Sequence, residues 1–201
     1  MSEGASLPLR AEVARKSLHI ATAALPVALS YGWSDQPTLR TVLTAAALVA
    51  LVVESLRSVW PAFSTAFSTV FGHLIRTHER RALTGATWLA MAMAVVLWVA
   101  PRDVAIAALW AAAVGDAAAA VVGRSVGRWR KRVGPGKTGV GSLAAAVVTA
   151  LGVLWLTPAS LAVASVLGVV AAAAERPTVP LDDNLRIALA VAFAASVLGL
   201  R

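Results

Sequence analysis

The 201-residue sequence contains no cysteine and few charged residues. Without cysteine there are no disulfide bonds and no metal sites built from thiolates. Charged residues make up 14% of the chain, whereas a typical soluble domain has roughly a quarter. Residues 1–9 also lack the basic, apolar and cleavage regions of a signal peptide. The low charge argues against an ordinary soluble domain.

Apolar stretches take the place of charge. Hydrophobic residues make up 59% of the chain, and its mean hydropathy is +0.76. Several apolar runs approach the ~20 residues that cross a bilayer as a helix. We therefore expect an all-α, polytopic integral membrane helix bundle that forms one membrane-embedded domain, residues 1–201. The seven expected transmembrane helices are Leu18–Tyr31, Leu39–Val59, Ala86–Ala100, Val104–Val122, Val140–Leu156, Ser160–Ala174 and Leu185–Leu200.

Basic residues are distributed unequally about these spans. Of the 18 Lys and Arg residues, only Arg40, Arg102 and Arg201 fall on the side opposite the N-terminus. Because basic residues concentrate in cytoplasmic loops, this asymmetry predicts a cytoplasmic N-terminus in the inner (cytoplasmic) membrane. The net charge of +8 then reflects topology, and we expect no nucleic-acid partner. The sequence does not indicate an oligomeric state.

Most acidic residues lie near the same predicted face, so we expect an active face on the cytoplasmic side. A channel or transporter would carry polar groups through its full depth. Asp116 lies about two turns inside the fourth span. A carboxylate at membrane depth costs about 2.5–3.5 kcal/mol and is usually paired and functional. The alternative is a structural ion pair with a basic residue on a neighbouring helix.

The segment that follows Asp116 is rich in glycine and basic residues. Glycine amides can converge on an anion, and Arg and Lys supply positive charge. Thr138 and Ser142 stand at the start of the next span, where a helix N-terminus favours phosphate. The segment is not a Walker A loop, because Lys131 occupies the place of the first glycine. The basic run at 128–132 is equally typical of lipid headgroup binding or topology.

Two further groups of polar residues flank the spans. Glu12, Arg15, Lys16 and His19 share one helical face, as they would in an interfacial helix with snorkelling basic side chains. Glu175, Asp182, Asp183 and Asn184 close the sixth span and open the seventh, where capping alone would explain them. Carboxylates beside a basic loop are also what a triphosphate with Mg²⁺ requires.

These motifs occur in a recognisable order. It runs Glu12-x-x-Arg15-Lys16-x-x-His19, Leu83-Thr84-Gly85-Ala86-Thr87, Gly115-Asp116, Gly123-Arg124-x-x-Gly127, Lys137-Thr138-x-x-Gly141-Ser142, Glu175 and Asp183-Asn184. The pattern resembles the CTP-dependent lipid-alcohol kinases, which include dolichol kinase, phytol kinase and the yeast-type CTP-dependent diacylglycerol kinase. A related signature occurs in phosphatidate cytidylyltransferases. One departure is Val140, where family members often carry an acid, so another carboxylate would have to replace it.

The resemblance implies a Mg²⁺-dependent enzyme that transfers the γ-phosphate of CTP, or another nucleoside triphosphate, to the hydroxyl of a lipid alcohol. The acceptor would be a polyprenol, a phytol-type alcohol or diacylglycerol, drawn from the membrane lipids. The alternatives are a cytidylyltransferase that makes a CDP-lipid, and a non-enzymatic membrane protein or small transporter.

The resemblance also implies roles for particular residues, with residues 115–142 as the nucleotide loop. The implied catalytic residues are Asp116 and Lys137. The implied nucleotide-binding residues are Gly123, Arg124, Gly127, Lys137, Thr138, Gly141, Ser142 and Asn184. The implied metal ligands are Asp116, Glu175 and Asp183. The residues expected to position the lipid are Glu12, Arg15, Lys16, His19 and Thr84.

Overall fold

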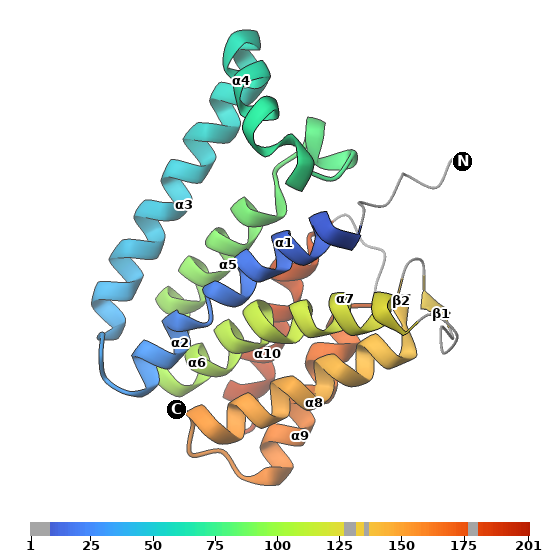
Figure 1. Cartoon of the computed structure of the whole chain (residues 1–201). Coiled ribbons are helices and arrows are strands. Elements are labelled where there is room, and N and C mark those ends of the chain that lie inside the picture. Colours follow the sequence, from blue (N-terminus) through green and yellow to red (C-terminus); the bar gives the residue numbers. More distant parts are fainter. Residues whose placement is uncertain (1–8, 127–131, 135–136, 177–180) are drawn as a thin grey trace.

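The structure is a computed structural model that describes residues 9–126, 132–134, 137–176 and 181–201. Figure 1 shows helices arranged as a bundle, with a small hairpin at one end. The helices are α1 Leu9–Ala21, α2 Ala24–Ser30, α3 Gln36–Val59, α4 Pro61–Phe71, α5 Gly85–Val99, α6 Arg102–Trp110, α7 Asp116–Ser125, α8 Gly139–Leu156, α9 Leu161–Ala174 and α10 Asp183–Val197. Shorter turns are the 3₁₀ helices η1 Gly72–Leu74 and η2 His78–Arg81 and the π-helical turn η3 Ala111–Gly115.

The hairpin consists of two short antiparallel strands, β1 Arg132–Gly134 and β2 Lys137–Thr138. Arg132 pairs with Thr138, and Gly134 pairs with Lys137. Since α8 begins directly after β2, the hairpin fixes Lys137 and Thr138 at the N-terminus of that helix.

Side chains just before several helices determine where those helices begin. Asp35 Oδ1 accepts a hydrogen bond from Thr38 N (2.7 Å) at the start of α3. Thr138 Oγ1 accepts one from Gly141 N (3.1 Å) at the start of α8. Each such cap stabilises its helix by about 1 kcal/mol.

A continuous central helix, formed by α6, η3 and α7, organises the bundle. The side chains from Val104 to Leu109 are fully buried, as are those from Ala111 to Ala113. The central helix contacts α1, α2, α5, α8 and α10, and α8 in turn packs on α9. Its alanines allow this close packing, because small side chains let neighbouring helices approach in a membrane.

The structure confirms the all-α fold class. In the described part of the chain, three helices are long and apolar enough to cross a membrane: Gln36–Val59, Arg102–Ser125 and Gly139–Leu156. The helices α5 and α9 are apolar but shorter. Large apolar side chains such as Leu48 and Leu151 face outward, as lipid contact requires. The count of seven spans and the cytoplasmic N-terminus stay predictions.

The first expected span, Leu18–Tyr31, is not one helix. It is divided at Thr22 and Ala23 into the end of α1 and the short α2. Pro26 explains the division, because a proline ring clashes with the carbonyl four residues earlier, which here belongs to Thr22. The prediction of a single helix was therefore wrong.

The helix α4, which follows α3 after Trp60, was not among the helices expected from the sequence. Figure 1 shows α4 at the far end of α3, where the two helices extend beyond the rest of the bundle. No residue of α4 is buried. Its aromatic rings form a ladder in which Phe63 stacks on Phe67, and Phe67 contacts Phe71 with centroids 5.1 Å apart.

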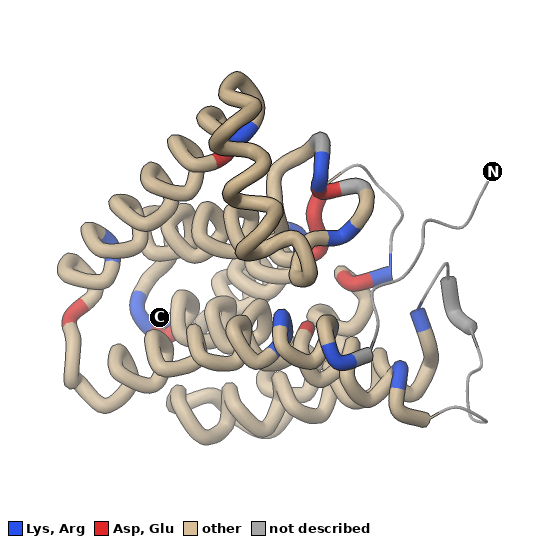
Figure 2. Tube along the Cα trace, turned by 45° about the horizontal axis from the view of Figure 1, so that its top comes forward, with Lys and Arg blue, Asp and Glu red and all other residues tan. Residues whose placement is uncertain are grey.

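Charged residues are concentrated in the half of the molecule that holds the N-terminus and the hairpin, as Figure 2 shows. Few lie near the C-terminus. The opposite end carries the exposed aromatic residues Tyr31, Trp33 and Trp155. We call these two regions the charged end and the aromatic end.

Candidate functional site

The polar residues of the charged end surround a cavity of about 210 Å³, which we call the Asp116 cavity. Its lining comes from α1, the loop after α4, α7, β2, α8, α9 and α10, which are widely separated in the sequence. The lining residues are Lys16, Arg76, Asp116, Ala119, Ala120, Gly123, Arg124, Lys137, Thr138, Gly141, Glu175 and Asp183. The fold thus brings predicted catalytic, nucleotide-binding and metal residues to one place.

Asp116 is almost fully buried, and the ammonium group of Lys16 donates a hydrogen bond to its carboxylate. The π-helical turn η3 ends directly before Asp116 and shifts the helical register at that point. Gly115 fits there because a Cβ would lie 2.5 Å from Thr149 Oγ1. Lys16, which was expected to position a lipid, is therefore a direct partner of the predicted catalytic carboxylate.

Lys137 connects two other carboxylates of the cavity. Its Nζ donates to Glu175 Oε1 (2.9 Å) and to Asp183 Oδ2 (3.2 Å). Burial alone would lower the pKa of Lys137, but the charges of Asp183 and Glu175 outweigh this effect and raise the pKa. Lys137 is therefore a permanent cation between two acids, in a position where a phosphate could replace them as its partner.

The helices α7 and α8 pack closely at two glycines near the hairpin. A Cβ on Gly141 would lie 2.7 Å from Ala119 O, and one on Gly123 would lie 2.7 Å from Thr138 Oγ1. Neither position has room for a side chain without movement of the backbone or of the Thr138 cap. The two predicted nucleotide-binding glycines therefore bring the end of α7 against the N-terminus of α8, beside Arg124.

A second polar cluster holds the N-terminus of α5 close to the cavity. Glu54 Oε1 accepts from Thr84 N (2.8 Å) and from Thr87 Oγ1 (3.0 Å). Glu79 Oε1 accepts from Gly85 N (3.0 Å). Arg57 pairs with Glu54 Oε2 at 2.5 Å, so the two charges of this i,i+3 pair neutralise each other.

Two predicted site residues belong to this second cluster. Thr84 caps α5 by accepting from Thr87 N (3.4 Å), and its role towards a lipid stays a prediction. Asn184 is buried and donates to Gly85 O (3.3 Å), so it links α10 to α5. For Asn184 the structure shows a contact between helices, and its role towards a nucleotide stays a prediction.

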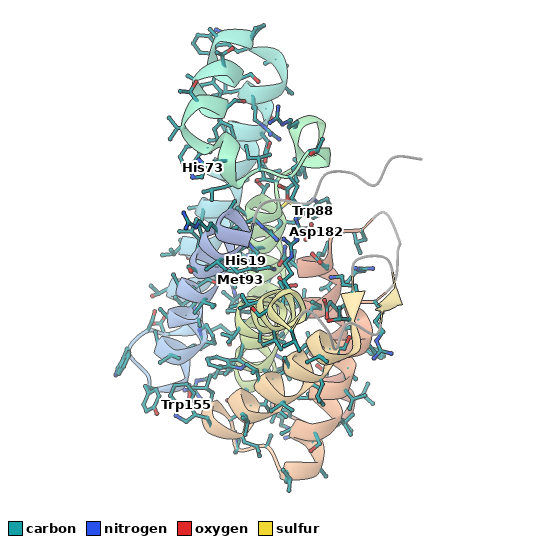
Figure 3. The ribbon with its side chains drawn as sticks, turned by 45° about the vertical axis from the view of Figure 1, so that its right-hand side comes forward. His19, His73, Trp88, Met93, Trp155 and Asp182 are labelled. Carbon is teal, nitrogen blue, oxygen red and sulfur yellow. The ribbon has the colours of Figure 1, made fainter. Side chains whose placement is uncertain are left out.

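The N-cap of α10 carries an unusual carboxylate. Asp182 Oδ1 accepts from Asn184 N (2.9 Å) and from Asn184 Nδ2 (2.7 Å). Burial, followed by repulsion from Asp183, raises the pKa of Asp182 to about 6. Asp182 and Trp88 are labelled in Figure 3, at the charged end of the bundle.

The remaining predicted residues have different outcomes. Gly127 and the side chain of Glu12 lie outside the described residues. Ser142 is buried in the first turn of α8, where its hydroxyl lacks a hydrogen-bond partner within the described chain. His19 and Arg15 are both buried on α1. His19 Nδ1 lies 3.9 Å from Asp116 Oδ2.

Sequence reasoning missed Arg76 as a lining residue of the Asp116 cavity. Glu79 Oε2 accepts a hydrogen bond from Arg76 N (2.8 Å) and so holds the backbone of that loop. The sequence offered one signal for this loop, which is the acidic Glu79 among basic neighbours. It contains no motif that would place the loop near α7.

Curated proteins with similar sequences share one name, CTP-dependent diacylglycerol kinase 1. The protein from Eremothecium gossypii is 32% identical over 137 residues, which are 68% of this chain and 43% of the relative. The Schizosaccharomyces pombe protein is 29% identical over 136 residues, covering 68% of this chain and 62% of the relative. The Saccharomyces cerevisiae protein is 25% identical over 137 residues, covering 68% and 47%.

The chain spans about half the length of the curated relatives it matches. No protein-family model matches it, and no solved structure is similar to it. The matches to these relatives confirm the resemblance that the order of motifs indicates.

Proposed function

Because the chain belongs to the CTP-dependent lipid kinase family, we propose that it transfers the γ-phosphate of CTP to the hydroxyl of a membrane lipid alcohol. The observation that carries the proposal is the Asp116 cavity, in which two lysines and three carboxylates from five separate elements meet beside a helix N-terminus. Phosphoryl transfer depends mainly on positioning and on neutralisation of phosphate charge, and such a cavity provides both.

Lys137 and Arg124 are the proposed phosphate ligands, together with the amides at the start of α8. Lys137 lies at the end of β2, and its present partners are carboxylates that a triphosphate can displace. Gly123 and Gly141 let the end of α7 pack directly against the start of α8 beside Thr138, and a helix N-terminus there favours anions. The proposed nucleotide site also includes the predicted residues Thr138, Ser142, Gly127 and Asn184.

The donor set of the cavity suits Mg²⁺ held jointly by protein and phosphate. Within the described residues, no three acidic or histidine side chains lie close enough together to hold a metal ion alone. Glu175 Oε2 is buried and has no hydrogen-bond partner among those residues. Mg²⁺ usually takes one or two carboxylates along with phosphate oxygens and water. The Mg²⁺ ion would be held by Glu175, Asp183 and Asp116, and it would neutralise negative charge on the phosphates.

In the proposed reaction, the lipid hydroxyl oxygen attacks the γ-phosphorus of CTP. A bond forms between that oxygen and the γ-phosphorus, and the bond to the β–γ bridging oxygen breaks, so CDP leaves. The hydroxyl proton passes to the carboxylate of Asp116. Lys16 keeps this buried carboxylate in place through its hydrogen bond. Asp116 replaces the acid that is missing at Val140.

Diacylglycerol is the first acceptor to test, because the relatives carry it in their names. Polyprenols and phytol-type alcohols remain acceptors to compare, since each offers one hydroxyl at the membrane boundary. The inner membrane and a cytoplasmic active face complete the proposal. The excess of basic residues at the charged end supports that orientation.

The test is phosphate transfer by the purified protein in detergent. It would be incubated with Mg²⁺, one lipid alcohol at a time, and either γ-labelled or α-labelled CTP. The proposal expects label in the lipid from γ-labelled CTP and unlabelled lipid from α-labelled CTP. Parallel reactions with γ-labelled ATP measure the preference for the base.

A cytidylyltransferase needs a lipid phosphate as acceptor, so matched reactions would contain dioleoyl phosphatidate in place of the alcohol. Label in that lipid from α-labelled but not from γ-labelled CTP would identify a cytidylyltransferase, because that reaction keeps the α-phosphate in the lipid and releases pyrophosphate. Absence of label in every lipid, together with no binding of CTP, would favour a non-enzymatic membrane protein or a transporter.

A further inference from the structure

An apolar cavity of about 320 Å³ lies next to the Asp116 cavity, and we call it the α4 groove. Its walls come from α1, α3, α4 and the start of α5. Val53, Phe67, Phe71 and Leu74 form much of its apolar surface. This volume is within the usual range for small-molecule sites, which is roughly 300–1,000 Å³.

The outer wall of the groove is the exposed helix α4. Phe67 and Phe71 line the groove, yet Phe71 remains 46% exposed, and no element in the described part of the chain buries α4. Its polar face carries Ser64, Thr65 and Ser68, which follow Phe63 and Phe67 by one or two positions and so lie on another side of the helix from the aromatic ladder. An apolar face beside a polar one is typical of a helix that lies in the membrane interface. The groove is therefore open to lipid at the charged end.

The inner end of the groove is polar, and its side chains are already occupied with one exception. Glu54 pairs with Arg57 and accepts hydrogen bonds from Thr84 N and Thr87 Oγ1. Glu79 accepts hydrogen bonds from Arg76 N and Gly85 N. The exception is His19, which is 3% exposed and has no hydrogen-bond partner for either ring nitrogen within the described chain. Because buried polar groups are almost always paired, such a histidine indicates a missing ligand.

His19 connects the groove with the Asp116 cavity. It lines the α4 groove, and its Nδ1 lies 3.9 Å from Asp116 Oδ2 in the Asp116 cavity. His19 thus links the groove to the carboxylate that is proposed to receive the hydroxyl proton. In Figure 3, His19 is labelled on α1 in the interior of the molecule.

We propose that the α4 groove binds the acceptor lipid, with the hydroxyl hydrogen-bonded to His19 and the first part of the tail against Phe67 and Phe71. This proposal rests on the proposed kinase function and specifies the acceptor site. In it, the exposed end of the groove lets the remainder of the tail stay in the membrane.

The charges of the groove select the chemical class of this lipid. Its lining includes one arginine, Arg15, and two acids, Glu54 and Glu79. A phosphate headgroup would meet two carboxylates at close range, and desolvating it there would be costly. A neutral alcohol needs only the hydrogen bond that His19 lacks. The groove therefore takes a neutral lipid alcohol and rejects a lipid phosphate.

The first test measures lipid binding without nucleotide. Protein in detergent would be labelled with a diazirine-bearing long-chain primary alcohol, and the labelled residues would be found by mass spectrometry. We expect labels on α4 and on the groove side of α1, removed by excess dioleoylglycerol but not by dioleoyl phosphatidate. Labels spread evenly over the lipid-facing helices, or equal competition by phosphatidate, would overturn the proposal.

The second test fills the groove. Ala50 of α3 lines it, whereas Ala46, one turn earlier, is exposed on the same helix. We expect Ala50→Phe to raise the KM for dioleoylglycerol at least tenfold and leave the KM for CTP within twofold. Ala46→Phe should change neither. If Ala50→Phe does not fold, the KM of Ala50→Leu for dioleoylglycerol and the labelling pattern test the groove as the lipid site instead.

The third test concerns the hydroxyl contact. His19→Leu should raise the KM for the lipid about tenfold, and His19→Gln, which keeps a hydrogen-bond acceptor, should recover most of that loss. Equal losses in both variants would show that His19 acts through packing and would contradict the contact.

The tests separate this inference from the proposed kinase function. Labelling of the groove by the probe in a protein that transfers no phosphate would support the lipid site and reject the kinase. A working kinase whose Ala50→Phe variant keeps the wild-type KM for lipid would reject the groove as the acceptor site.

Discussion

The charged end and the aromatic end of the bundle both contain charged side chains, but they use them differently. At the aromatic end Arg102, Asp35 and Arg40 contact backbone groups at helix termini. Arg102 Nη2 donates to Leu29 O (2.6 Å) and Ser30 O (2.8 Å), and Asp35 caps α3. Arg40 stacks on Trp98 at 4.6 Å and donates to Leu97 O.

At the charged end the side chains instead pair with one another around open space. Asp116 pairs with Lys16, and Lys137 pairs with Glu175 and Asp183, all on the lining of one cavity. Charges that satisfy backbone groups stabilise the fold without a ligand. Charges that pair only with other side chains can exchange these partners for phosphate and metal, which is why we assign function to this end.

The largest expected effect comes from Asp116→Asn. The variant keeps the shape of the side chain but removes the proton acceptor, so kcat should fall about 10²–10⁴-fold. Phosphate transfer from γ-labelled CTP measures it, with thermal melting as the check on folding. The matched control is Asp35→Asn at the aromatic end, where asparagine caps a helix as well as aspartate does. More than a tenth of wild-type activity in Asp116→Asn would remove its catalytic role.

Lys137→Met should mainly weaken nucleotide binding. The loss of a charged phosphate ligand predicts an increase of about 10–100-fold in the KM for CTP. Lys137→Arg, which keeps the charge, should lie between this variant and the wild type. The comparison at the aromatic end is Arg102→Met, which should lower the melting temperature and leave the KM for CTP unchanged. An unchanged KM for CTP in Lys137→Met would contradict the phosphate contact.

Gly141→Ala tests the glycine crossing of α7 and α8. The new Cβ would meet Ala119 O at 2.7 Å, so we expect a loss of about 1–3 kcal/mol in stability from overpacking. Weaker CTP binding should accompany it. Gly72→Ala is the control, because its nearest neighbour, Ser68 Cβ, would lie at an ordinary 3.9 Å. Equal melting temperatures for both variants would show that the crossing has more room than the structure gives it.

Asp182→Asn should change stability, by an amount that depends on pH. The pKa of Asp182 is raised from 3.8 to about 6, so the folded protein holds a proton there that the unfolded chain has lost. Stability from this group is present below about pH 4 and is lost as the pH rises to about 6. We therefore expect Asp182→Asn to be about 3 kcal/mol more stable than wild type at pH 7.5 and equal to it at pH 4. Melting curves at the two pH values would show it, and a difference independent of pH would refute it.

The sequence predicted the parts of this site that depend on local chemistry. Apolar length identified the helical class, and Thr138 and Asp182 begin helices because their side chains accept amide hydrogen bonds. Asp116 could be selected because a carboxylate in an apolar helix needs a partner. Each of these inferences needs only the residues of one segment of the chain.

Other features could not be predicted, because they depend on contacts between distant segments. The expected single helix at Leu18–Tyr31 is interrupted near Thr22. Lys16 was assigned to a lipid, but packing of α1 on α7 places it on Asp116, 100 residues away. Asn184 was assigned to a nucleotide, and it holds α5 through Gly85 O.

The amino-acid order alone therefore determined a helical membrane protein, the ends of its helices, and a glycine-rich basic segment next to a carboxylate. Only the tertiary structure decided which cations meet which carboxylates, and that α4 and His19 form a groove beside them. The physical reason is the range of the interactions. Helix formation and capping act over a few neighbouring residues, whereas a buried ion pair or a shared cavity wall depends on how whole helices pack.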